Sequence, residues 1–261
     1  MAYKRGGPLV NHSFVFKIAS AIVFYFVWII AIFVCKILYS VRYENRRLIR
    51  RFKGNAILVA NHTTLLDPVM ISGVTIPRLM YHTMLESTVE TPILGTFTRL
   101  LGGVPLPRGM SGLEKMLASA PEMFRHRRFI LVYPEGECFL YNQIVNEHKF
   151  GAYYIAAKLN LPVIPVVTVF SEGRFPAGAF FARKLPRVHL VILDPVMPST
   201  YIRYKENSEL DLNSVKELAN TVQTIMQNEI DNRHAKNPRW GTQAYFKGKM
   251  PRMKGINHEN T

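Results

Sequence analysis

Beyond Gly54 the chain alternates short apolar runs with longer amphipathic stretches, and this alternation restricts the possible folds more than any other feature. Strands separated by helices need crossover connections, which are typical of an α/β sheet. The sequence therefore predicts an α/β domain in which helices flank the sheet. The expected strands are residues 57–60, 78–85, 129–133, 163–169 and 188–193, and the expected helices are residues 92–100, 112–126, 150–159 and 212–232.

The region before this domain is apolar and then basic. Residues 18–35 carry no formal charge and are bounded by Lys17 and Lys36, which is the minimum length for a membrane-spanning helix. The run is too long for the core of a signal peptide, and no small-residue cleavage site follows it. The chain is therefore predicted to begin with a membrane-anchoring helical segment.

A basic segment follows the apolar run. Arg42, Arg46 and Arg50 recur every four residues, which predicts a helix lying on an anionic bilayer. Lys and Arg are denser after the apolar run than before it, so the rest of the chain is predicted to face the cytoplasm. The alternative is a solvated basic helix that follows a buried core helix.

The net charge of +15 requires an anionic partner, such as nucleic acid, a membrane surface, or a phosphorylated or CoA-type substrate. No zinc-ligand spacing or RNA-binding aromatic signature occurs, so we expect no nucleic acid partner. The two cysteines, Cys35 and Cys138, have no neighbours that indicate a disulfide, and no metal site is predicted.

The stretch "NHTTLLDP" places His62 and Asp67 five positions apart. On a straight strand or helix these side chains would diverge, so only a bend between them brings them together. An apolar run at residues 56–60 precedes the pair, and Asp67 followed by Pro68 suits a helix start with aspartate as the N-cap. The segment therefore predicts a strand, a polar turn and a helix.

The same spacing occurs at His189 and Asp194, in "HLVILD". No turn residue interrupts this strand-like run, so its two side chains are predicted to be separated and structural.

Three further turns carry chemically useful residues. "LGGVPLPRG" ends in Arg108, and "VYPEG" places Glu135 and Gly136 directly after an apolar run. "LPVIPVV" begins a strand with two prolines, which restrict the backbone. Taken singly, these turns are also compatible with an exposed arginine, a solvated glutamate and an edge strand.

In this order, "NHTTLLD", "GGVPLPR", "YPEG" and "LPVIP" resemble the four motif blocks of the glycerolphosphate and lysophospholipid acyltransferase superfamily. The resemblance is nearest to bacterial 1-acylglycerol-3-phosphate acyltransferases and covers residues 54–196. It implies the acyltransferase fold, with a mixed sheet, and a membrane-bound O-acyltransferase of phospholipid biosynthesis. The expected acceptor is a lysophospholipid, the expected donor is acyl-CoA or acyl carrier protein, and no cofactor is expected.

The resemblance also assigns roles to residues. It implies that His62 is the general base, that Asp67 orients it, and that Arg108, Glu135 and Gly136 belong to the acceptor site. Acyl transfer to an alcohol needs removal of the hydroxyl proton, a task that suits imidazole. No G-x-S-x-G turn occurs, so direct transfer without an acyl-enzyme is expected.

The sequence departs from the family in two blocks. Glu137, Cys138 and Phe139 stand where the third block has Thr-Arg-Ser, and Pro105 and Pro107 replace an aromatic residue and an aspartate of the second. These changes leave acyl transfer possible but leave the acceptor open. The cations that could replace the missing arginine are Arg127, Arg128, Lys149 and Arg174.

Two alternatives follow from these departures. One is an acyltransferase for another lipid acceptor, such as an ornithine lipid, a glycolipid or a monoacylglycerol. The other is a non-catalytic, membrane-binding homologue. The expected organisation is a membrane anchor with a basic interfacial helix in residues 1–53, an acyltransferase domain in 54–235, and a basic, mobile tail in 236–261.

Overall fold

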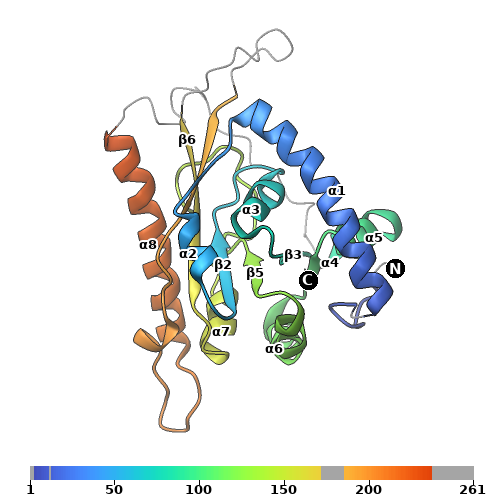
Figure 1. Ribbon diagram of the computed structural model, residues 1–261. Helices are drawn as coiled ribbons and strands as arrows, with labels where there is room; N and C mark the ends of the chain where they lie inside the picture. The colour runs from blue at the N-terminus through green and yellow to red at the C-terminus, as the bar shows by residue number, and fades with distance from the viewer. Residues whose placement is uncertain (1–2, 12, 172–184, 237–261) are drawn as a thin grey trace.

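The computed structural model describes residues 3–11, 13–171 and 185–236, and these form a seven-stranded sheet with helices on both faces (Figure 1). The strand order is β1-β7-β6-β2-β5-β3-β4. Only β6 and β7 pair in the antiparallel direction, so the sheet is mixed, as predicted. The strands are β1 (Arg42–Glu44), β2 (Ala56–Ala60), β3 (Met80–Leu85), β4 (Gly103–Leu106), β5 (Phe129–Val132), β6 (Val163–Ser171) and β7 (Arg187–Ile192).

The helices form two layers. The first layer comprises α1 (Phe14–Tyr39), α2 (Arg46–Arg51) and α3 (Asp67–Thr75), and the second comprises α6 (Gly109–His126), α7 (Gly151–Lys158) and α8 (Leu212–Lys236). Figure 1 shows α1 and α8 on opposite sides of the sheet. Two short helices, α4 (Glu86–Glu90) and α5 (Pro92–Leu100), connect β3 to β4, and the 3-10 turn η2 (Pro198–Thr200) follows β7.

The position of β2 between two apolar cores explains why its sequence is apolar at every residue, without alternation. Ile57 and Val59 pack with the core under α6, α7 and α8, whereas Leu58 and Ala60 pack with the core under α1 and α3. A central strand that is covered on both faces needs apolar residues at every position. The turn that carries His62 therefore follows the central strand of the sheet, which is buried at every residue.

The predicted basic helix is wrong in extent and orientation. Arg42 lies in β1, where it pairs with His189, and α2 contains only six residues. Ile49 is 1% exposed and packs against the sheet, so the apolar side of this segment faces the protein core. Apolar spacing alone does not distinguish packing against a bilayer from packing against a sheet.

Two proline-containing segments also differ from their simplest interpretations. The segment "LGGVPLPRG", predicted as a turn, contains β4, an edge strand in which Pro105 is tolerated because one side of the strand needs no partner. In contrast, the "LPVIPVV" strand is β6, which lies inside the sheet between β7 and β2.

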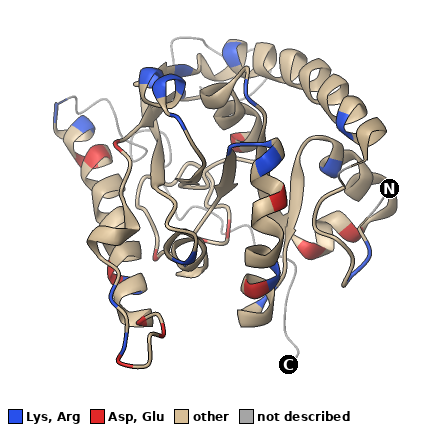
Figure 2. Cartoon of the chain, turned by 60° about the horizontal axis from the view of Figure 1, so that its bottom comes forward, with Lys and Arg blue, Asp and Glu red and all other residues tan. Residues whose placement is uncertain are grey.

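Helix α1 lies along the domain instead of standing away from it. Trp28 Nε1 donates to the carbonyl of Val69 in α3, and the Ser20 hydroxyl donates to the carbonyl of Leu100 in α5. The opposite side of the helix is apolar and exposed, and Figure 2 shows α1 without charged residues over most of its length. The exposed residues are Phe14, Val15, Ile18, Ile22, Phe26, Ile29, Ile30, Phe33, Val34 and Ile37.

Among the described helices, α1 is the one long and apolar enough to cross a membrane, by length and composition. Only 22% of its most apolar window is buried, which is low for the core helix of a soluble protein. The anchor prediction is therefore compatible with α1. The predicted tail beyond Lys236 and Arg174 lie outside the described residues.

Candidate active site

The turn after β2 brings His62 and Asp67 into contact. His62 Nδ1 lies 2.9 Å from Asp67 Oδ2, so the predicted bend is present. One detail differs from the prediction, because Asp67 is the first helical residue of α3 and the N-cap position belongs to Leu66. The Asp67 carboxylate points back into the turn instead of capping the helix.

Asp67 is fully buried and receives four hydrogen bonds from the two threonines of the turn. The backbone N–H groups of Thr63 and Thr64 donate to Oδ2 at 2.6 and 2.9 Å, and their hydroxyls donate to Oδ1 at 3.3 and 2.9 Å. Because an ionised carboxylate only accepts hydrogen bonds, the His62 contact requires a proton on Nδ1. Nε2 then carries the lone pair that a base needs.

The imidazole is held from one face by Tyr133. The two rings stack with their centroids 4.1 Å apart and an interplanar angle of 19°. The Tyr133 hydroxyl is buried, and it has no hydrogen-bond partner among the described residues. The sequence prediction missed this residue, and its only local signal is an aromatic ring at the end of the apolar run 129–133.

Glu135 connects the histidine turn to the loop that follows β5. Its Oε1 accepts the His62 backbone N–H at 3.1 Å, and its Oε2 accepts the N–H and side-chain amide of Asn146 at 3.2 and 2.6 Å. Burial raises the pKa of the Glu135 carboxyl, while the donors from Asn146 and His62 oppose that shift. Both oxygens are bonded within the protein, so Glu135 positions the His62 turn.

Further backbone bonds join the loop after β5 to the same turn. Phe139 N–H donates to the His62 carbonyl and Tyr141 N–H donates to the Thr63 carbonyl, both at 2.8 Å. The loop therefore runs alongside the turn, and the position of His62 depends on a segment more than 70 residues later in the chain.

The turn is also bonded to β6, which extends beyond the end of β2. Asn61 exchanges two hydrogen bonds with the backbone of Thr168, and Gln143 accepts the Phe170 N–H at 2.9 Å. Side-chain amides thus satisfy backbone groups that a longer β2 would have paired.

Residues 40–169 match the family model described as Acyltransferase. The chain belongs to the acyltransferase family. It is similar to 1-acyl-sn-glycerol-3-phosphate acyltransferase of Escherichia coli (strain K12), with 26% identity over 181 residues, 68% of this chain and 67% of that protein. It also shares the fold of the crystal structure of 1-acyl-sn-glycerophosphate acyltransferase from Thermotoga maritima, with a TM-score of 0.51 and 24% identity over 77% of this chain and 73% of that one.

In this acyltransferase Arg108 is exposed at the start of α6, directly after β4. Strands β5 and β3 lie between β4 and β2, so Arg108 and His62 belong to turns that begin about 14 Å apart across the sheet. The described residues offer its guanidinium no hydrogen bond or ion pair. Arg108 and His62 both follow the carboxyl ends of their strands, and this is the edge of the sheet meant below, but the two side chains are not in contact.

Of the cations predicted to replace the missing arginine of the third motif, Lys149 is the one that the described part of the chain places at this end of the strands. The side chain of Lys149 lies over Gly136, where an added Cβ would overlap its ammonium group. Gly136 also has a φ of 75°, so a larger residue is disfavoured by the backbone as well. Arg127 and Arg128 precede β5 and lie at the opposite edge of the sheet.

The two thiols near the site are poor nucleophiles. Burial, and then the Asp67 charge, raise the pKa of Cys35 to about 11, and burial is also the main reason that the pKa of Cys138 rises to about 12. Both thiols therefore stay protonated near neutral pH. Cys138 thus adds no charge and no thiolate to the acyltransferase site.

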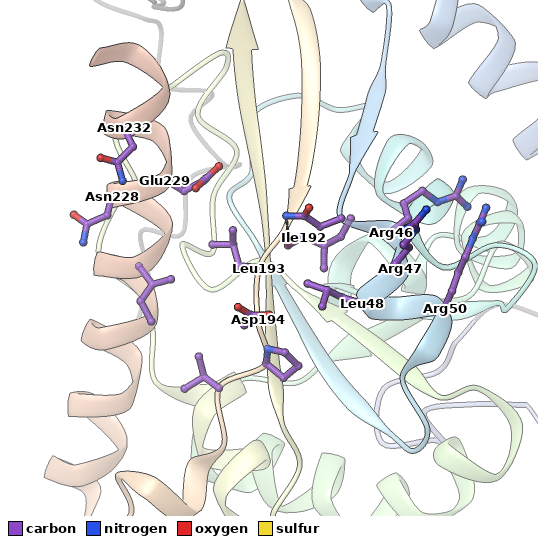
Figure 3. A pocket seen from close by; sticks show the side chains of 14 residues that line it. Arg46, Arg47, Leu48, Arg50, Ile192, Leu193, Asp194, Asn228, Glu229 and Asn232 are labelled. Atoms are coloured by element: carbon purple, nitrogen blue, oxygen red, sulfur yellow. Dashed lines mark hydrogen bonds between the residues drawn. The ribbon is translucent and has the colours of Figure 1, made fainter. Parts of the chain in front are cut away.

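The second pair with the same spacing is separated, as predicted. His189 contacts Glu44 Oε1 at 3.0 Å and the Ser171 hydroxyl at 2.9 Å, and it is 4% exposed. Asp194 lies beyond the end of β7, where it lines a groove of about 1110 Å³ between α2 and α8 (Figure 3). The groove is lined by α2, the segment at the end of β7 and α8, and His62 is not among its lining residues.

Proposed function

We propose that this acyltransferase moves a fatty acyl group from an acyl thioester to a hydroxyl of a lysophospholipid-type acceptor at a membrane surface. The observation that carries the proposal is the His62–Asp67 contact, with a buried carboxylate on Nδ1 and a partly exposed imidazole. The two relatives described above, which act on 1-acylglycerol phosphate by name, support the acceptor class.

The proposed mechanism is direct transfer. The oxygen of the acceptor hydroxyl attacks the thioester carbonyl carbon while His62 Nε2 takes the hydroxyl proton. Asp67 stabilises the imidazolium that forms, without taking the proton itself. The tetrahedral intermediate then breaks its carbon–sulfur bond, and the departing thiolate takes the proton back from the imidazolium. The products are an ester and a free thiol.

The acceptor is proposed to carry a phosphate. Lys149 is the charged group beside Gly136 at the edge that carries His62, and Arg108 lies farther along that edge. An ammonium group can bind phosphate as a point charge, without the two-pronged geometry of arginine. A lysophospholipid thus fits better than a monoacylglycerol, which has no charge for Lys149 to bind.

Membrane attachment is proposed to occur through a surface shared by α1 and α5. The two helices contact each other, and both expose apolar side chains, which on α5 are Ile93, Leu94 and Phe97. A contiguous apolar surface of this kind is typical of membrane-interaction sites. We propose that it lies in the cytoplasmic leaflet, with α1 along the interface.

The experiment that tests the function is mass spectrometry of the lipids formed by the purified protein. The panel comprises lysophosphatidic acid, other lysophospholipids, an ornithine lysolipid and monoacylglycerol, each with acyl-CoA and with acyl carrier protein. Formation of a diacyl phospholipid supports the proposal. Acylation of only uncharged acceptors would favour the alternative substrate class, and absence of any product would favour a non-catalytic membrane protein.

Lys149→Gln is expected to weaken the use of phosphorylated acceptors by about tenfold to a hundredfold, which corresponds to loss of one charge-assisted bond. Use of monoacylglycerol should not change, because that acceptor has no phosphate. The measurement is kcat/KM for both acceptors. Arg128→Gln is the matched control, since it removes one exposed positive charge at the opposite edge of the sheet. Equal losses in the two variants would contradict a phosphate contact at Lys149.

Charged substitutions on the outer side of α1 are expected to release the protein from vesicles. Ile22 and Phe26 are 64% and 67% exposed, so the Ile22→Glu, Phe26→Glu variant should fold but lose apolar contact with the bilayer. The expected loss in vesicle binding exceeds tenfold, from about 1.5–3 kcal/mol per buried side chain. Leu212→Glu on α8 is the control. Deletion of residues 1–53 is less suitable, because it also removes β1.

A further inference from the structure

We propose that a basic cavity beneath the amino-terminal half of α1 binds the phosphate group of an anionic membrane phospholipid. The cavity has a volume of about 220 Å³ and is lined by residues 9–11, by α1, and by residues at the amino ends of β3, β4 and β5. This inference rests on the proposed attachment of α1 to a membrane, but it concerns a different site from the one that carries His62.

The cavity lies at the opposite edge of the sheet from the acyl-transfer site. Leu79 directly precedes β3, Gly103 begins β4, and Arg127 closely precedes β5. His62 and Glu135 instead follow the carboxyl ends of β2 and β5. A six-residue strand such as β3 separates the two edges by about 20 Å, so a lipid bound here does not occupy the acceptor site.

Arg127 is the central cation of the cavity. Its NH2 group donates to the Ser20 hydroxyl and its NH1 group to the Met80 carbonyl, both at 2.8 Å, and the guanidinium lies 4.8 Å from the Tyr81 ring centroid. Among the described residues no carboxylate contacts it. Burial lowers the pKa of Arg127, which reflects the cost of holding a charge away from water. A bound anion would remove much of that cost.

Two more permanent cations line the same cavity. Arg99 is 8% exposed and lies over the Tyr3 ring, and Lys17 is exposed on α1. Lys17 Nζ lies 3.4 Å from His126 Nε2, which also contacts a carboxylate oxygen of Glu122 at 3.0 Å. Among the described residues, three positively charged side chains thus line the cavity, and the Glu122 carboxylate lies beside it through its contact with His126. The chemistry of this cavity therefore favours an anion.

The backbone leaves room for the arginine. Gly102 has a φ of 94°, and a Cβ at this position would overlap the Arg127 guanidinium. Arg127 can thus reach across the amino end of β4 to Ser20 of α1 only because residue 102 has no side chain. The same guanidinium connects the sheet to α1, so an anion bound here would strengthen the contact between them.

The apolar residues beside the cavity favour a lipid as the source of the phosphate. Phe14, Val15 and Ile18 are 76%, 77% and 46% exposed and lie within three residues of Lys17 on α1. With this side of the helix in the bilayer, the cavity opens at the depth of the headgroups. A phospholipid gains both the ionic contact with the cavity and the apolar contact of its acyl chains. Inorganic phosphate or CoA gains only the ionic contact.

The test compares substitutions of two lysines of α1, each made in the full-length protein that also carries His62→Ala. Binding is then measured without turnover and does not depend on whether acyl transfer occurs. Lys17→Gln removes a charge at the cavity, and Lys36→Gln removes the same charge at the other end of the helix. Binding is measured by flotation with phosphatidylcholine vesicles, with and without phosphatidylglycerol. A general surface charge contributes about fivefold to binding of anionic vesicles. The Lys17→Gln variant should show a loss of vesicle binding several times larger than that of the Lys36→Gln variant. This difference should occur only with vesicles that contain phosphatidylglycerol.

A second measurement separates the possible sources of phosphate. Soluble dihexanoyl phosphatidylglycerol should raise the thermal midpoint of the His62→Ala protein, and Lys17→Gln should reduce that rise. Arg127→Lys, which keeps the charge but loses the second donor group, should also reduce it. Equal effects of Lys17→Gln and Lys36→Gln on vesicle binding would overturn the site. An equal rise with inorganic phosphate or CoA would overturn its assignment to a lipid.

Discussion

His62→Ala should lower the rate of acyl transfer by about 10²- to 10⁴-fold, the usual effect of removing a general base. The side chain is 20% exposed and lies in a turn, so its loss should leave no large cavity in the core. Fold and vesicle binding should therefore be retained. The measurement is kcat with saturating donor and acceptor, on protein whose unfolding transition matches that of the unmodified chain.

The matched control for this prediction is His189→Ala. This histidine has an aspartate at the same spacing, but its contacts are Glu44 and Ser171. It is buried, so the variant should be less stable, while each folded molecule should keep its turnover. An inactive but folded His189 variant, or a fully active His62 variant, would place the base elsewhere in the chain.

Asp67→Asn should also be severe, with a loss in kcat that is within the range of about 10²- to 10⁴-fold expected for His62→Ala. An amide can present an N–H to His62 Nδ1 and thereby stabilise the wrong tautomer, and it cannot stabilise the imidazolium. The variant should also unfold more easily, by about 1.5–3 kcal/mol, because Thr63 and Thr64 lose a charged acceptor.

The two effects of Asp67→Asn can be separated by their measurements. Chemical denaturation gives the change in stability, and kcat per folded molecule gives the catalytic loss. Asp194→Asn is the control, because this carboxylate is exposed and follows a histidine at the same spacing. It should leave both quantities unchanged. If Asp67→Asn lowered stability alone, the carboxylate would be a structural part of the turn.

The sequence predicts the parts of the site that depend on local chemistry. A buried strand, two threonines and an Asp-Pro helix start are enough to bend the chain between His62 and Asp67, because each of these preferences acts within a few residues. For the same reason the continuous strand at His189 is predicted correctly. The alternation of short apolar runs with amphipathic stretches beyond Gly54 also predicts the α/β sheet.

Features that depend on distant contacts were not predicted. The stack of Tyr133 on His62 and the bond from Asn146 to Glu135 require the loop after β5 to lie beside the turn after β2, which no local pattern encodes. The placement of Lys149 over Gly136 has the same origin. Residues 42–44 were assigned to a helix because arginine spacing does not reveal a partner strand 145 residues away.

The difference in length between β2 and β6 couples local opening of the active site to opening of the sheet. Asn61 and Gln143 bond to the part of β6 that β2 does not reach, so the histidine turn, the loop after β5 and the central strand share one set of hydrogen bonds. The turn cannot separate from the sheet without releasing the Thr168 amide. This part of the active site therefore belongs to the same cooperative unit as the core, and amide exchange at Thr168 reports its opening.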